Sequence, residues 1–170
     1  MASTKAGYNE DKVALLIGCF IFVLGLGKMV GLDPLGWVLK MGMWVDNPVD
    51  SWRSATKGML PGWGALVASY VFITALLAIG VKAMKGNVGK FIYGFTIIFF
   101  IGIACYTVGA NAYVAANPTQ LSKMGITWSL GLSTEAGLIV ALLMGIFIGN
   151  FAPNFAESLH DACRPELFVK

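Results

Sequence analysis

Residues 91–116 read FIYGFTIIFFIGIACYTVGANAYVAA and contain no charged side chain. A transmembrane helix needs about 20 mostly apolar residues to cross the roughly 30 Å hydrocarbon layer of a bilayer. At a rise of about 1.5 Å per residue, a helix over 91–116 would be about 39 Å long. We therefore expect this stretch to cross a membrane with a tilt or with one end protruding.

The composition of the whole chain excludes a water-soluble fold. Of the 170 residues, 57% are hydrophobic and 12% are charged, whereas about 25% of the residues in a soluble domain are charged. The net charge is +3, and no long basic run with interleaved aromatic residues accompanies it, so nucleic-acid binding is excluded as well. The expected partner is the lipid bilayer.

Hydropathy predicts an all-α membrane protein with about four transmembrane helices. Pro61 suits a first helical position, Asn87 precedes the third span, and Ser133 precedes the fourth. Lys28, near the end of the first span, can extend its ammonium group to the lipid headgroups. The expected spans are residues 10–31, 61–81, 89–116 and 133–154.

The segment between the first two spans, residues 34–57, is predicted to lie at the membrane surface. Residues 35–45 carry only Lys40 as a charge, and an apolar run of this length is typical of an interfacial or re-entrant helix. A short polar helix is expected to follow over residues 50–57. The tail, residues 153–164, has apolar residues on one helical face, which predicts an amphipathic surface helix.

Basic residues predict the orientation of the chain. Lys82, Lys85 and Lys90 lie in the short connection between the second and third spans, with no acidic residue among them. Short basic loops stay in the cytoplasm, so both chain ends are expected there, in a bacterial inner membrane. The tryptophans then fall on the opposite side, where their rings suit the headgroup layer. These are Trp37, Trp44, Trp52, Trp63 and Trp128.

No pattern in the chain predicts an enzyme. The single histidine is His160, in the polar tail, so neither a Ser/His/Asp set nor a His-Glu-x-x-His metal site can be assembled. A glycine-rich phosphate loop is also missing from the sequence. We expect no catalytic residue, no metal and no cofactor.

The charged residue that reaches deepest into an apolar region is Glu135, for which two interpretations stay open. In the first, Ser133 caps the fourth helix and Glu135 lies in its first turn near the headgroups. In the second, the helix begins near Ile126, so that Glu135 lies inside the membrane and marks an ion path or a buried pair. The candidate substrate-binding residues are Ser133, Thr134, Glu135 and Asn150.

Two Gly-x-x-x-Gly patterns predict close packing of helices, because paired glycines let two backbones approach each other. They are Gly27 with Gly31, and Gly145 with Gly149. The packing partner can be another helix of this chain or a second subunit, so a homo-oligomer and other membrane subunits are both expected. Asn150 is expected to hydrogen-bond to a neighbouring helix.

Three stretches carry a family resemblance: WVDNP at 44–48, GVKAMKGNVGKFIYGF at 80–95 and RPELFVK at 164–170. Together they resemble the amino-terminal portion of the YeiH-type sulfate exporter family. The resemblance implies an inorganic anion as a partner. It also implies that the chain is the leading part of a longer transporter, with the transport pathway in the remainder. No substrate-site residue is carried over from it.

Two functions stay open. In the first, the chain is the amino-terminal membrane module of a sulfate or anion exporter, with a scaffolding or regulatory role and no transport of its own. In the second, it is a stand-alone structural subunit of a larger membrane complex, which the glycine faces favour. A reading frame that continues beyond Lys170 with apolar segments would favour the first, and a stop codon the second.

Overall fold

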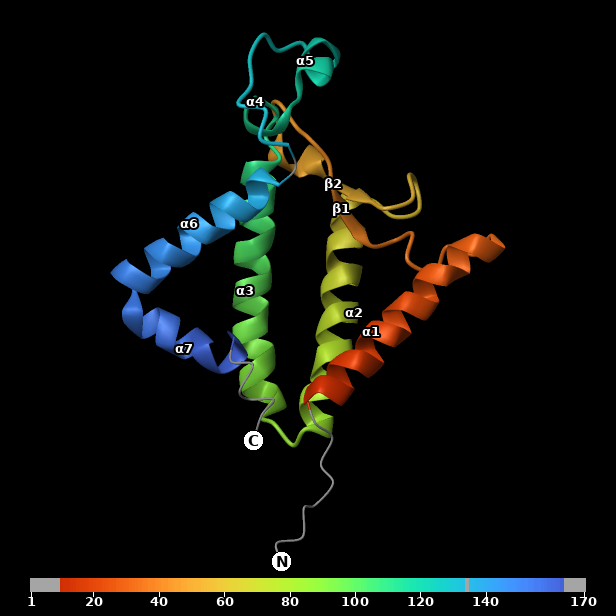
Figure 1. The fold of residues 1–170 in the computed structure, drawn as a ribbon, viewed down its shortest axis with the longest axis vertical. Helices are drawn as coiled ribbons and strands as arrows, with labels where there is room; N and C mark the ends of the chain where they lie inside the picture. The colour runs from red at the N-terminus through yellow and green to blue at the C-terminus, as the bar shows by residue number, and fades with distance from the viewer. Residues whose placement is uncertain (1–9, 134, 164–170) are drawn as a thin grey trace, which may run out of the picture.

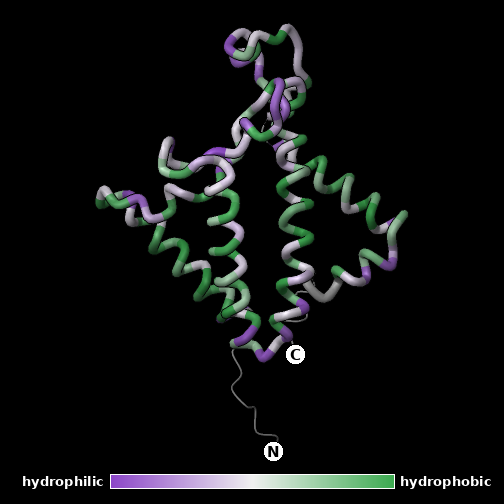
Figure 2. Tube along the Cα trace, turned by 180° about the vertical axis from the view of Figure 1, so that it is seen from behind, coloured by the Kyte–Doolittle hydropathy of each residue, from purple (hydrophilic) through white to green (hydrophobic). Residues whose placement is uncertain are grey.

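The computed structural model describes residues 10–133 and 135–163. It confirms the all-α membrane class: three helices are long and apolar enough to cross a membrane, or four if a bent pair counts as one span. Figure 2 shows hydrophobic residues along the length of these helices. Thr134 and residues 164–170, for which the sequence also made predictions, lie outside the described residues.

Two antiparallel helices, α2 (Gly62–Ala83) and α3 (Val88–Gly109), form the centre of the structure (Figure 1). The Asn87 side chain accepts a hydrogen bond from the Lys90 amide at 3.1 Å and so caps α3. Farther along the pair, the hydroxyl oxygens of Tyr70 and Thr96 lie 2.6 Å apart. This hydrogen bond joins α2 to α3 where a bilayer would offer no water as a partner.

The first span leans away from this pair. Helix α1 (Glu10–Leu26) continues into a 3-10 turn, η1 (Gly27–Val30). It approaches α2 at Gly80, where an added Cβ would lie 3.0 Å from Val13. Elsewhere large apolar side chains are open, such as Phe22, which is 66% exposed. Such a surface suits contact with lipid tails or with another apolar helix.

The fourth predicted span, 133–154, and the predicted tail helix, 153–164, correspond to two helices in the structure. These are helix α6 (Ala136–Phe151) and helix α7 (Pro153–Cys163), and the chain bends by 116° between them. Pro153 has no amide hydrogen and fixes its own φ angle, which ends α6 just before it. In Figure 1, α7 runs back to α3, and Leu159 is buried. The tail is therefore a helix, as predicted, and packs against α3. Its place at the membrane surface stays a prediction.

The predicted helices of segment 34–57 are wrong. Strands β1 (Leu39–Met41) and β2 (Trp52–Ser54) pair antiparallel there, and a 3-10 turn, η2 (Pro48–Ser51), precedes β2. The strand form satisfies backbone groups that a short helix would leave open at its ends. One of them, the Leu39 amide, donates to the Ser69 hydroxyl of α2 at 2.7 Å.

The third span is shorter than predicted. Helix α3 ends at Gly109, and two short helices, α4 (Ala112–Ala115) and α5 (Pro118–Met124), follow it. The Asn111 side chain accepts from the Tyr113 amide at 3.0 Å and starts α4 as a separate helix. The run of uncharged residues therefore continues beyond the helix that crosses the membrane.

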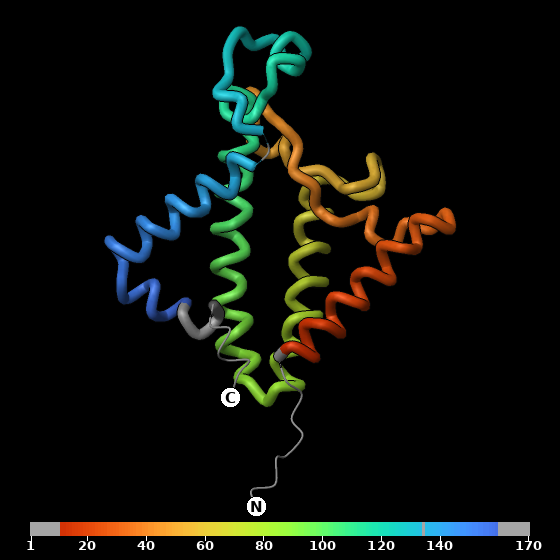
Figure 3. Tube along the Cα trace, viewed as in Figure 1, coloured from red at the N-terminus to blue at the C-terminus, as the bar shows by residue number. Residues whose placement is uncertain are grey.

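The helices divide the molecule into two ends. The start of α1 and the connection between α2 and α3 lie at one end (Figure 3). The two strands, with Trp52 in β2, lie at the other together with α4 and α5, and Trp63 lies there in the first turn of α2. Trp37 lies deeper, because its ring contacts the Phe72 ring at the middle of α2. We call this second end the tryptophan end. Which end faces the cytoplasm stays a prediction.

Helices α3 and α6 make their closest approach at two glycines that no sequence pattern singled out. A Cβ on Gly109 would overlap the backbone of Gly137, and a Cβ on Gly137 would lie 2.7 Å from the Tyr106 ring. Backbone contact of this kind excludes every side chain larger than hydrogen at either position.

We expect Gly109→Ala to lower the free energy of unfolding by about 1 to 3 kcal/mol, because the methyl group forces α6 away. Gly102→Ala is the matched control on the same helix, since a Cβ there meets nothing within 4 Å. It should be neutral or stabilising by up to about 1 kcal/mol. Chemical unfolding in detergent, followed by circular dichroism, measures both. Equal effects would contradict the glycine contact.

Candidate functional site

The structure does not bring the predicted substrate-binding residues together. Ser133 and Glu135 lie at the start of α6, whereas Asn150 lies near its other end. The distance along the helix axis from Glu135 to Asn150 is about 22 Å. Thr134, the fourth predicted residue, lies outside the described part of the chain.

The structure contradicts the helix start near Ile126 that the second interpretation of Glu135 requires, and it differs from the first in placing Glu135 at the cap position, one residue before the first turn. Helix α6 begins at Ala136 with Glu135 as its cap residue, and residues 126–133 are not helical. The Glu135 side chain is exposed, and its amide donates to the Ser133 hydroxyl at 3.4 Å. A carboxylate in this position complements the positive end of the helix dipole.

The remaining predicted polar and glycine contacts differ from expectation. The Asn150 side chain donates to the Ile146 carbonyl of its own helix at 2.7 Å, and not to a neighbouring helix. Gly31 ends η1 with a φ of 81°, a conformation that glycine adopts without strain. A Cβ on Gly145 or Gly149 would meet nothing within 4 Å. Packing of these two against a second subunit stays a prediction.

Three residues join the tryptophan end to α3, and we call them the tryptophan clamp. The Trp44 indole donates to the Thr107 carbonyl at 2.6 Å. The Trp52 indole donates to the Thr107 hydroxyl at 2.9 Å, and this hydroxyl donates in turn to the Ile103 carbonyl at 2.7 Å. The Trp44 backbone also pairs with α3 and α4, since its carbonyl accepts from the Ala112 amide at 2.8 Å.

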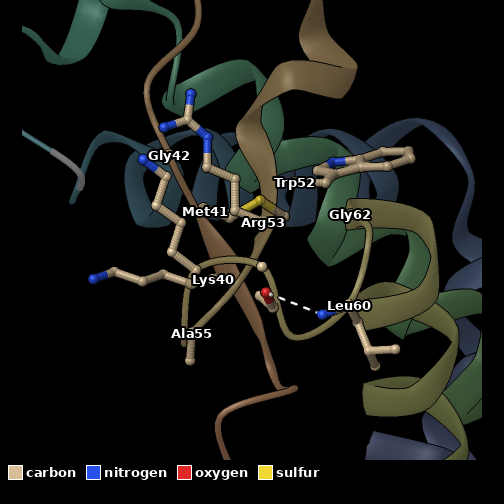
Figure 4. A pocket seen from close by; sticks show the side chains of 11 residues that line it. Lys40, Met41, Gly42, Trp52, Arg53, Ala55, Leu60 and Gly62 are labelled. Atoms are coloured by element: carbon tan, nitrogen blue, oxygen red, sulfur yellow. Dashed lines mark hydrogen bonds between the residues drawn. The ribbon is translucent and has the colours of Figure 1, made fainter.

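A cavity with a basic lining lies beside β1 and β2. Its volume is about 460 Å³, and its lining includes three basic residues, Lys40, Arg53 and Lys57. We call it the cationic pocket. Lys40 and Arg53 are direct partners across the two strands, so their side chains lie on the same face of the sheet. Figure 4 shows both extending away from α2.

Local packing fixes Arg53 more than the two lysines. Its Nε donates to the Asp50 carbonyl at 3.0 Å. An added Cβ on Gly42 would lie 3.1 Å from this Nε, so the glycine leaves room for the side chain to cross β1. In the described residues no ion pair reaches Lys40, Arg53 or Lys57.

Two like charges directly opposite each other destabilise a strand pair. A bound anion would remove this repulsion and accept hydrogen bonds from three side chains that carry only donors. The pocket can therefore hold an anion. Sequence reasoning missed it because the three residues converge only when the segment forms strands.

Two apolar cavities accompany the cationic pocket. One, of about 430 Å³, lies between α2 and α3 and includes Trp52, Trp63 and Phe100 in its lining. We call it the apolar groove. The other, of about 310 Å³, lies between α3, α6 and α7, and its lining includes Gly102, Gly145 and Gly149. Within the described residues, no group of three metal-ligating side chains is present.

The comparisons with known proteins give one informative match. The chain is 31% identical over 165 residues to a UPF0324 membrane protein from Nitrosomonas europaea. This relative, a UPF0324 membrane protein, is a homologue of the chain. UPF0324 is the YeiH family, which the three sequence stretches resemble. The match covers 95% of this chain and 34% of the relative, so the chain spans about a third of that protein's length.

The other two comparisons give no match. No family model matches the chain, and no solved structure matches it.

We expect Glu135→Gln to lower the free energy of unfolding by on the order of 1 kcal/mol, because it removes a charge that complements the α6 dipole. Glu157→Gln, at an exposed position beyond the first turn of α7, is the control and should change it less. Thermal unfolding in detergent compares the two variants. A loss above about 3 kcal/mol for Glu135→Gln would instead indicate a buried charge pair.

Proposed function

We propose that the chain is a membrane module of a YeiH-family anion exporter, corresponding to the amino-terminal portion of that family. Its role is scaffolding or regulatory, and it does not transport by itself. The match to a UPF0324 membrane protein over 95% of this chain supports the family. The coverage of a third of that relative supports the role as a part of a larger transporter.

The proposal that the chain does not transport by itself rests on the side chains that line its spans. A doubly charged anion needs a sheltered site near the midplane, at broken helices or charged groups that replace its water shell. A break does separate α6 from α7. The cavity beside it, however, is lined by apolar and small residues, such as Ile98, Met144 and Gly145.

Most polar side chains within the described spans have partners, and the exception is the buried Thr74 hydroxyl of α2, which has none. Tyr70 and Thr96 bond to each other, and Asn150 bonds to its own helix. The basic residues of the cationic pocket lie at the tryptophan end, outside the spans. This arrangement favours contact with anions at the membrane surface over their passage through the bilayer.

A stand-alone structural subunit is the second candidate, and the exposed apolar side chains of α6 favour it. Leu142 is 65% exposed and Phe151 is 76% exposed. Gly145 and Gly149 line the cavity between α3, α6 and α7, so a helix of another subunit could approach them closely only by entering that cavity. In either role, we propose an inner-membrane location with both ends of the chain in the cytoplasm, on the basis of Lys82, Lys85 and Lys90.

We expect proteoliposomes that contain only this chain to take up no more labelled sulfate than empty liposomes do, because the described spans offer the ion no cluster of charged groups near the midplane. A full-length YeiH-family protein, reconstituted in parallel, is the control for the assay. Circular dichroism of the proteoliposomes verifies that the chain is folded. Saturable, protein-dependent uptake would overturn the scaffold role and identify a transporter.

A further inference from the structure

We propose that the cationic pocket and the apolar groove together bind one anionic phospholipid, with its phosphate in the pocket and an acyl chain in the groove. The site stands on the geometry of the tryptophan end. It does not depend on the proposed part in anion export, because a lipid-binding site serves a structural subunit equally well.

The headgroup half of the site is the basic cluster. Lys40, Arg53 and Lys57 are exposed and line one cavity of about 460 Å³. The strand register holds Lys40 opposite Arg53, and the bond to the Asp50 carbonyl uses only the Nε of Arg53. The terminal guanidinium nitrogens and both ammonium groups therefore stay available for phosphate oxygens.

The depth of the pocket suits a lipid headgroup. Trp52 lines the pocket. The Trp63 ring packs edge-on against the Trp52 ring, with 4.4 Å between the two ring centroids. Trp63 lies in the first turn of α2, at the end of that span, and is 58% exposed. Exposed tryptophans at span ends lie at the headgroup level, so the three basic side chains are at the depth of the lipid phosphates.

The acyl half of the site is the apolar groove. Its volume is about 430 Å³, and it runs along α2 and α3 past Leu66, Phe100, Ile103 and Val108. Trp52 lines both this groove and the cationic pocket. Trp52 and Arg53 are consecutive residues of β2, so their side chains lie on opposite faces of the strand pair. A lipid that places its phosphate beside Lys40 and Arg53 therefore has to pass around the strand pair at Trp52 before it lays a chain along the two helices.

Charge complementarity selects the lipid. A zwitterionic lipid would bring a second cation to a site that already holds three, whereas phosphatidylglycerol brings a net negative charge. A free oxyanion would use the pocket alone and leave the groove unfilled. The proposal therefore predicts a preference for phosphatidylglycerol that needs both the basic side chains and the open groove.

The test measures lipid adducts on the full chain by native mass spectrometry, with phosphatidylglycerol and phosphatidylcholine offered in equal amounts. We expect the wild-type chain to retain phosphatidylglycerol. The double variant Lys40→Gln with Arg53→Gln should lower its retention by a factor on the order of ten to thirty. Lys28→Gln with Lys123→Gln removes the same charge at the same end, outside the pocket, and should change it little.

Two further variants make the test specific. Lys57→Gln should lower retention about fivefold, and it serves if the double variant does not fold, as judged by circular dichroism. Ala104→Phe fills the apolar groove, where Ala104 is exposed, and should also lower retention. Ala141→Phe is its control, because Ala141 lines the cavity between α3, α6 and α7.

Competition with inorganic phosphate and sulfate separates the two sources of an oxyanion. Retention of the lipid in millimolar phosphate or sulfate, together with its loss in Ala104→Phe, supports the phospholipid site. Displacement by either ion with no effect of Ala104→Phe would overturn it in favour of a free-oxyanion site. Equal retention of the two lipids, or equal losses in the pocket variants and the Lys28/Lys123 control, would overturn binding at this pocket.

Discussion

The hydrogen bonds of the tryptophan clamp hold the tryptophan end against α3, and the proposed binding sites lie at this end. Thr107 lies in the last turn of α3, which ends at Gly109. The final carbonyls of a helix receive no hydrogen bond from amides of the same helix. The Trp44 indole donates to the Thr107 carbonyl, and the Trp52 indole donates to the Thr107 hydroxyl. Because Thr107 is buried, leaving these groups unpaired would cost the penalty of an unsatisfied buried polar group.

The clamp determines where the basic side chains lie. Trp52 is the partner of Met41 in the strand pair, next to the pair of Lys40 and Arg53. When Trp52 binds α3, the two strands are held across the start of α2, where Gly62 has no Cβ to obstruct the Trp52 carbonyl. The cationic pocket and the apolar groove then share Trp52 as a wall, so one contact positions both halves of the proposed lipid site.

Hydropathy predicts the spans because a bilayer requires long apolar helices, and each such helix is formed by consecutive apolar residues. It could not predict the strands at 39–41 and 52–54, because they depend on contacts with Ser69 and Thr107, far away in the chain. Nor could it end α3 at Gly109, since Asn111 stops the helix within an uncharged run. The glycine pattern named Gly145 and Gly149, whereas the close approach uses Gly109 and Gly137, which stand singly on two helices.

The hydrogen bond between Trp52 and Thr107 can be measured directly by double-mutant cycles on the free energy of unfolding in detergent. Trp52→Phe and Thr107→Val should be coupled by about 0.5 to 1.5 kcal/mol, because each removes one partner of the same bond. Trp44→Phe is the matched control, since Trp44 bonds to the Thr107 carbonyl, which Thr107→Val retains. Its coupling to Thr107→Val should be near zero. Absence of coupling for Trp52, or equal coupling for both tryptophans, would contradict the tryptophan clamp.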